Sequence, residues 1–211
     1  MKSISGIAVL AGIVLASQAC GSSTLVQLPP RIDLTQHEIL GVIEFTSSAK
    51  GSLAPYTTRT FIEEMRADQG MIRVVELGPQ EALLESLGLT RLDRAAFLAI
   101  AEEHGLTTIV TGELEVSGVR PNISIRPNLS GISAAADVDA DLGVRMIEAA
   151  SGASIWSRSA DGTHRVGHVN VLGGNFDFDA EDPEEAYGEL VRALVQSVTT
   201  DFKARYERRR N

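Results

Sequence analysis

The chain has 211 residues, of which 44% are hydrophobic, with 28 acidic against 19 basic residues and a formal net charge of −9. Such an acidic chain lacks the electrostatic attraction on which general nucleic-acid binding depends, so we predict no nucleic-acid partner. Its length and hydrophobic fraction suit a single domain with a sizeable core.

The first predicted element is a leader that ends at Cys20, the only cysteine of the chain. Lys2 supplies a positive charge, and the apolar stretch 4–16 is shorter than the about 20 residues that a membrane-spanning helix needs. Residues 17–19 are mostly small. The pattern resembles a bacterial lipoprotein signal peptide, which predicts cleavage after residue 19 and lipid on Cys20. Ser17 is less usual at its position, so an ordinary secretory leader with a chance cysteine is the alternative.

Lipidation predicts a protein held on a membrane by the acyl chains on Cys20. Gly21 follows the cysteine where an Asp would favour retention at the inner membrane, so we expect the periplasmic face of the outer membrane. Removing residues 1–19 takes away Lys2 and no acidic residue, and the formal charge moves from −9 to −10. Residues 20–37 are rich in Ser, Thr, Gln and Pro and are predicted to be a flexible tether. Residues 38–211 are predicted to form one α/β domain.

From Ile39 onward, short apolar runs typical of buried strands alternate with amphipathic segments typical of helices. Asp93 is a suitable N-cap, and Gly105 is suitable just past the end of that helix. The pattern predicts strands at 39–45, 71–77 and 106–116, and helices at 56–66, from Pro79, and between Asp93 and Gly105.

A strict period of two follows, and it predicts a long hairpin over about 119–146. Apolar residues occupy odd positions from Val119 to Leu129 and even positions from Ala134 to Met146, with Ser130-Gly131 at the join. Alternation of this length suits membrane strands as well as strands that cover helices in a soluble domain. The candidate residues for membrane or partner contact are Val119, Ile123, Ile125, Leu129, Val138 and Leu142.

The rest of the chain predicts a strand at 155–158, a weaker hairpin around Gly173-Gly174 and a C-terminal helix. That helix is expected to begin at Asp182-Pro183 and to continue through Phe202 into a basic end, Lys203–Arg210. Acidic residues at its start and basic ones at its end would complement the helix dipole.

The alternating acids Asp137, Asp139 and Asp141, with Glu148 further on, match part of a calcium-loop pattern. That loop needs a glycine where Leu142 stands, and the alternation requires an extended chain. We therefore interpret the acids as a polar strand face, paired with Arg120 and Arg126.

Three further sets of residues are candidates for a metal, catalytic or ligand-binding site. His164 and His168 would lie roughly 13 Å apart on a strand, which is too far to share a metal. Ser47 and Lys50 fit a Ser-x-x-Lys spacing without the other motifs of penicillin-recognising enzymes. Trp156 is interpreted as a strand-packing residue. We predict no metal, no cofactor and no enzymatic activity.

Five segments in order resemble the superfamily of envelope proteins that contains CsgG, LpoB and the N-terminal domain of TolB. They are Leu40–Phe45, Ile72–Glu76, Gln80–Leu84, Thr108–Glu113 and Met146–Trp156. The resemblance implies an α/β fold with helices packed on a mixed sheet, a long hairpin and a C-terminal helix. It also implies a non-enzymatic periplasmic role. In CsgG-like proteins two hairpins per subunit build an outer-membrane pore, whereas the second hairpin here runs into an acidic segment at 175–185.

Two functions follow from the resemblance. The first is a CsgG-like component of envelope assembly or transport, a homo-oligomer that can form a secretion channel. The second is an LpoB-like adaptor that activates a penicillin-binding protein as its envelope partner. A tether of fewer than 20 residues reaches only about 25 Å, which favours the first, and a hydrolase ranks a distant third.

Overall fold

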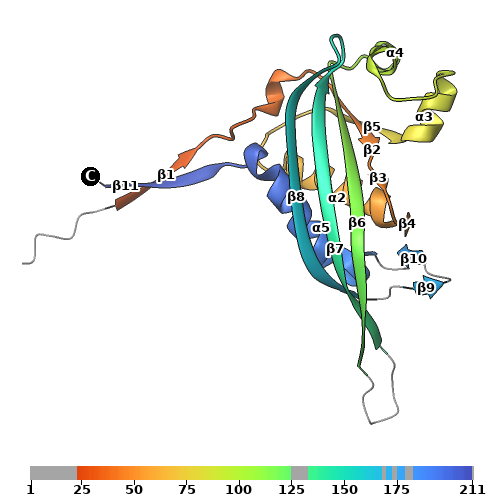
Figure 1. Ribbon diagram of the computed structural model, residues 1–211. Coiled ribbons are helices and arrows are strands. Elements are labelled where there is room, and N and C mark those ends of the chain that lie inside the picture. Colours follow the sequence, from red (N-terminus) through yellow and green to blue (C-terminus); the bar gives the residue numbers. More distant parts are fainter. Residues whose placement is uncertain (1–22, 125–132, 168–169, 173–174, 179–182, 211) are drawn as a thin grey trace, which may run out of the picture. The chain divides into compact units, whose positions relative to one another are not determined.

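The computed structural model describes residues 23–124, 133–167, 170–172, 175–178 and 183–210. The chain divides into two compact units: the main one is Arg31–Lys203, and the small one combines the residues before Arg31 with those after Lys203. The main unit confirms the predicted fold class, because its helices pack on a mixed sheet and include a C-terminal helix (Figure 1). Among the described residues, no helix combines the length and the apolar character needed to cross a membrane.

The sheet of the main unit has the strand order β5-β2-β6-β7-β8, and β3 also pairs with β6. Pairing is parallel among β5, β2, β3 and β6 and antiparallel from β6 through β7 to β8. The strands are β2 (Leu40–Glu44), β3 (Thr46–Ser47), β5 (Val74–Pro79), β6 (Thr108–Ser124), β7 (Ser133–Glu148) and β8 (Ala153–Gly167).

Helices cover both faces of this sheet at the end where the parallel strands lie. Successive strand residues point to opposite faces, so Val42 belongs to the core cluster that includes α2 and α5, while Ile43 belongs to the one that includes α3 and α4. The continuous apolar run of β2 is explained by this double coverage. The helices are α2 (Leu53–Arg66), α3 (Gln80–Ser86), α4 (Arg94–His104) and α5 (Pro183–Val198), which continues into the 3₁₀ turn η3 (Thr199–Phe202).

Helix α4 begins and ends as its sequence predicts. The Asp93 carboxylate accepts hydrogen bonds from the backbone N–H groups of Ala95 and Ala96, and Gly105 adopts the left-handed conformation with φ of 65°. Phe97 lies on its inner face with 7% of its surface exposed. The helix is therefore fixed by local signals and by burial together.

The long hairpin is paired as predicted, but it is part of the central sheet. β6 starts at Thr108 and pairs with β7 as far as Ser124 with Ser133. The register shifts between Val116 and Gly118, which inserts one extra residue into β6. The extra residue explains why apolar residues change from even to odd positions there: Val116 pairs with Ala140, whereas Val119 pairs with Val138. The join at 125–132 lies outside the described residues.

A small sheet in the main unit contains the weaker predicted hairpin. β9 (Asn170–Leu172) and β10 (Asn175–Phe178) pair antiparallel, and β10 pairs in parallel with β4 (Lys50–Gly51). The glycines predicted at the turn, residues 173–174, lie outside the described residues.

Two predictions about the ends of the chain were wrong. Residues 20–37 were expected to lack secondary structure, yet β1 (Ser23–Leu28) forms there and Leu34, in the 3₁₀ turn η2 (Leu34–Gln36), is fully buried. The basic segment expected to end the last helix contains the strand β11 (Arg205–Arg210). β1 and β11 pair antiparallel over six residues, so each supplies the backbone partners that the other lacks.

Candidate functional site

The most extensive candidate site is the polar face of β6, β7 and β8. Along each strand, buried residues such as Leu114 and Leu142 alternate with exposed polar ones. Register places the polar residues in rows across the three strands. In order along the face, the rows are Thr111–Arg145–Ser157, Glu113–Gly143–Ser159 and Glu115–Asp141–Asp161.

One of these rows places three carboxylates directly opposite one another. Glu115, Asp141 and Asp161 are all exposed, and no ion pair joins any of them to another described residue. Like charges directly opposite on neighbouring strands destabilise a sheet. The row is therefore not explained by the stability of the fold. The alternation of the sequence indicates Asp141 as part of a polar strand face, whereas Glu115 and Asp161 were not predicted, since only the register of the sheet brings the three together.

The next acids along the face are neutralised. Arg120 donates two hydrogen bonds to Asp139, of 2.5 and 2.8 Å, and Thr163 donates a third of 2.5 Å. The hydrogen bonds from Arg120, followed by that from Thr163, lower the pKa of Asp139 from 3.8 to about 2. Asp137 pairs with Arg165 at 3.3 Å. The predicted pairing of Arg120 with this acidic face is confirmed, and Arg126 lies outside the described residues.

An open depression of about 690 Å³ adjoins the polar rows on the side of α3. Its lining is mainly polar and includes the acidic residue Glu113 and the basic residues Arg145 and Arg158. Thr46, Gln80, Ser157 and Ser159 also line it. Gly143 lies in this lining, and a Cβ there would have no heavy atom within 4 Å. The surface is thus accessible and hydrogen-bonding, as a contact surface for another polar molecule requires.

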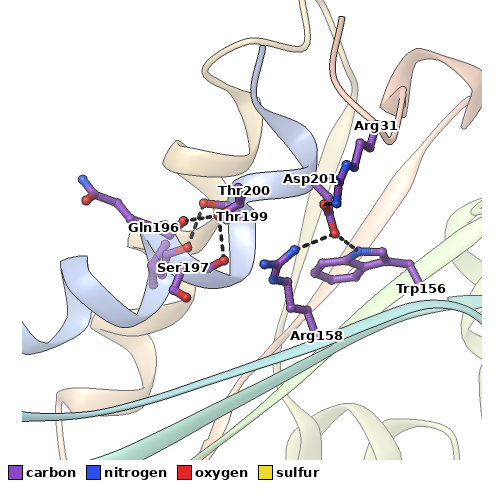
Figure 2. Close-up of polar contacts among 9 residues, drawn as sticks. Arg31, Trp156, Arg158, Gln196, Ser197, Thr199, Thr200 and Asp201 are labelled. Carbon is purple, nitrogen blue, oxygen red and sulfur yellow. Dashed lines mark hydrogen bonds and ion pairs between the residues drawn. The ribbon is translucent and has the colours of Figure 1, made fainter. Parts of the chain in front are cut away.

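A second polar cluster, centred on Asp201, joins β8, η3 and the entry of the chain into the main unit. The Asp201 carboxylate accepts hydrogen bonds from Arg158 at 2.9 Å, from Trp156 Nε1 at 3.3 Å and from Arg31 at 3.3 Å (Figure 2). Its backbone carbonyl accepts from the N–H groups of Arg31 and Ile32. Burial alone would raise the pKa of Asp201, but these hydrogen bonds and the arginine charges outweigh it and lower the pKa.

The Asp201 cluster is structural. The Trp156 ring packs on the ring of Phe202, with centroids 4.7 Å apart, as expected for a strand-packing tryptophan. Gln69 also links residues 32–34 to η3. Its side chain donates hydrogen bonds to the carbonyls of Ile32 and Phe202 and accepts one from the N–H of Leu34. Sequence reasoning missed Asp201 and Gln69 because their partners are distant in the chain.

The residues predicted for membrane or partner contact lie in different surroundings. Val138 and Leu142 are fully buried in the core cluster that contains α2 and α5. Val119 pairs with Val138, and Ile123 pairs with Ala134. Ile125, Leu129 and the lipidation candidate Cys20 lie outside the described residues.

The acids, histidines and serine–lysine pair weighed in the sequence analysis form no metal site within the described part of the chain. No three Asp, Glu, His or Cys side chains among the described residues are arranged to hold an ion. His164 is described, and His168 is not. Ser47 lies in β3 and accepts a hydrogen bond from the N–H of Ala49, while Lys50 begins β4.

No protein-family model and no curated protein matches the sequence. Solved structures similar to the chain include a PelC dodecamer from Paraburkholderia phytofirmans, at 12% identity over 87% of this chain and 99% of that one, with a TM-score of 0.46. Lipoprotein GNA1162 from Neisseria meningitidis is 16% identical over 64% and 88% of the two chains, with a TM-score of 0.34. The LpoB C-terminal domain from Escherichia coli is 18% identical over 63% and 88%, with a TM-score of 0.39. The predicted likeness to CsgG stays a prediction.

Proposed function

We propose that this chain is a lipid-anchored, non-enzymatic protein of the bacterial envelope that works close to the membrane as a subunit of an assembly or transport complex. Its anchor is the acyl chains on Cys20, and Gly21 in place of Asp favours the periplasmic face of the outer membrane. The proposal combines the leader pattern of residues 1–20 with the structure of the segment that follows it.

The pairing of β1 with β11 is the observation that carries this proposal. Even a free tether over residues 20–37 would reach only about 25 Å, which is short for an adaptor that reaches toward the cell wall. The structure fixes part of this segment as well, because β1 begins three residues after Cys20 and only Pro29 and Pro30 separate it from the main unit. A six-residue ribbon spans roughly 20 Å. The main unit is thus restricted to the neighbourhood of its anchor, which supports a membrane-proximal subunit over an adaptor.

A channel built from the long hairpin is a special form of this proposal, and the geometry of β6 and β7 gives it little support. Among the described residues, β8 pairs with β7 from Glu148 as far as Ala135, so this part of β7 is held between β6 and β8. A tilted membrane strand needs roughly 9–11 residues. A membrane-inserted arm that included Val138 and Leu142 would have to withdraw both from the core, where they are fully buried. We therefore favour assembly through surface contacts over insertion of this hairpin.

The deciding experiment measures the mass of the lipidated protein extracted in detergent, by size-exclusion chromatography with light scattering. We expect a homo-oligomer several times the 22.5 kDa of the chain. A monomer that binds a periplasmic enzyme would instead support the adaptor. Cys20→Ser is expected to abolish labelling by a fatty-acid probe in cells, and unchanged labelling would contradict lipidation.

The channel form has its own test in two neighbouring positions of the hairpin. If the hairpin inserts, Ile125→Arg on the lipid side should cost roughly 2–4 kcal/mol and block assembly, while Ser124→Arg on the lumen side should be tolerated. Equal membrane fractionation and conductance of the two variants would rule out insertion and leave the non-inserted complex.

A further inference from the structure

The ribbon formed by β1 and β11 carries a charge opposite in sign to that of the whole chain. β11 contains four arginines and one glutamate, and β1 contains no charged residue, so the ribbon has a formal charge of +3 in a chain of net charge −9. The glutamate, Glu207, lies 3.8 Å from Arg209. Arg205 and Arg208 are exposed and make no ion pair with any other residue that the structure describes. A local basic surface thus interrupts an acidic protein.

The same ribbon also exposes large apolar side chains. Leu25 is 60% exposed and Tyr206 is 63% exposed. Leu25 pairs with Arg208, and Gln27 pairs with Tyr206, so the period of two places Leu25, Tyr206 and Arg208 on one face of the ribbon. An aliphatic, a tyrosyl and a guanidinium group on one face match the lipid headgroup region, where tyrosine is enriched and long basic side chains keep their charge in water.

We propose that the β1–β11 ribbon is a membrane-binding element that lies on an anionic phospholipid surface beside the lipid anchor. Its basic residues complement the negative headgroups, and its start at Ser23 lies three residues after Cys20. For its location the inference rests on the proposed lipidation of Cys20, but the binding itself needs no acyl chain. The acidic main unit is repelled by the same surface, so the ribbon also sets which part of the protein contacts the membrane.

The test uses the mature chain from residue 20 with Cys20→Ser, which removes the acyl chains and retains both units. Sedimentation with vesicles of phosphatidylcholine, with or without phosphatidylglycerol, measures binding. We expect binding to the vesicles that contain phosphatidylglycerol and its loss at high salt, because ions screen the attraction. Arg208 lies on the face of Leu25 and Tyr206, whereas the register places Arg205 on the opposite face of the ribbon. Arg208→Gln should therefore weaken binding about fivefold, and adding Arg205→Gln should weaken it further by less than fivefold, because the attraction falls with distance from the anionic surface.

Two further variants test whether a loss of vesicle binding is caused by the lost charge, or instead by unfolding or by the loss of a contact with another protein. Arg205→Lys with Arg208→Lys should keep vesicle binding, since a lipid surface responds to charge, whereas a bidentate protein contact depends on the guanidinium shape. Arg66→Gln with Arg94→Gln changes the net charge equally, at exposed positions of α2 and α4, and should leave binding unchanged.

Three results would overturn the proposal. The first is equal binding to both vesicle types, and the second is an equal loss in the ribbon variant and in the control variant at Arg66 and Arg94. The third is a variant with Arg205→Gln and Arg208→Gln that binds vesicles as before but no longer forms the oligomer. That result would mean that the ribbon binds the acidic sheet face of another copy. Failure of lipidation would appear separately, as absence of fatty-acid labelling at Cys20.

Discussion

Replacing Asp201 with alanine should destabilise the main unit more than replacing Arg31, one of the two arginines that bind its carboxylate. The Asp201 side chain is only 15% exposed, and Arg158, at 2.9 Å, is 35% exposed. Hydrogen bonds to charged groups contribute about 1.5–3 kcal/mol, and the longer bond from the Trp156 indole adds about 0.5–1.5 kcal/mol. Because Arg158 is partly hydrated, its contribution is reduced, and the expected loss of unfolding free energy is about 2–3 kcal/mol. Arg31 binds the same carboxylate but is 60% exposed, so Arg31→Ala should cost less than about 1 kcal/mol.

Urea unfolding followed by the fluorescence of Trp156 measures both losses, because this sole tryptophan lies in the cluster. A double-mutant cycle of Asp201→Ala with Arg158→Ala isolates the coupling between the two charges. The lowered pKa of Asp201 implies stability that is fully present above the ordinary aspartate pKa and is lost as the pH falls through the folded value. The reasoning would be refuted by an Asp201→Ala loss no larger than that of Arg31→Ala, or by absence of coupling to Arg158.

Three further changes test the core and the polar sheet face. Phe97→Ala should cost roughly 3–5 kcal/mol in urea unfolding, and an unchanged midpoint would contradict the packing of α4. Asp141→Thr should raise stability by about 0.2–1 kcal/mol by relieving like-charge repulsion, whereas Asp139→Thr should lower it; the same sign for both would contradict the described ion pairing. Arg120→Gln should raise the pKa of Asp139 from about 2 toward 3.8 in a carboxyl titration by NMR. Since that pKa is depressed in the fold, its stabilising effect is complete above about pH 4 and disappears as the pH falls to about 2.

The elements with strong local signals could be predicted from the sequence. Helix α4 has an N-cap at Asp93 and a glycine past its end, and both signals act within a few residues. Strands β6 and β7 alternate over many residues, so their type and pairing were predictable. The continuous apolar run of β2 likewise indicated a strand that is buried on both faces.

The rest depends on contacts between distant parts of the chain, which local patterns do not encode. β1 reads as a polar linker and β11 as the basic end of a helix until each supplies the other with backbone partners. The extra residue in β6 is invisible until its register with β7 is known. The acidic row of Glu115, Asp141 and Asp161 likewise exists only as a consequence of pairing three strands.

Pairing of the first described strand with the last has a consequence for biosynthesis. Ser23 is among the first residues of the described chain to leave the ribosome, and its partner Arg210 is among the last. The backbone groups of β1 therefore stay unpaired until β11 has been translated, and such edges are prone to pairing with other chains. A nascent chain interrupted before Arg205 would carry β1 without its partner strand, and this unpaired edge would distinguish it from a chain that contains β11.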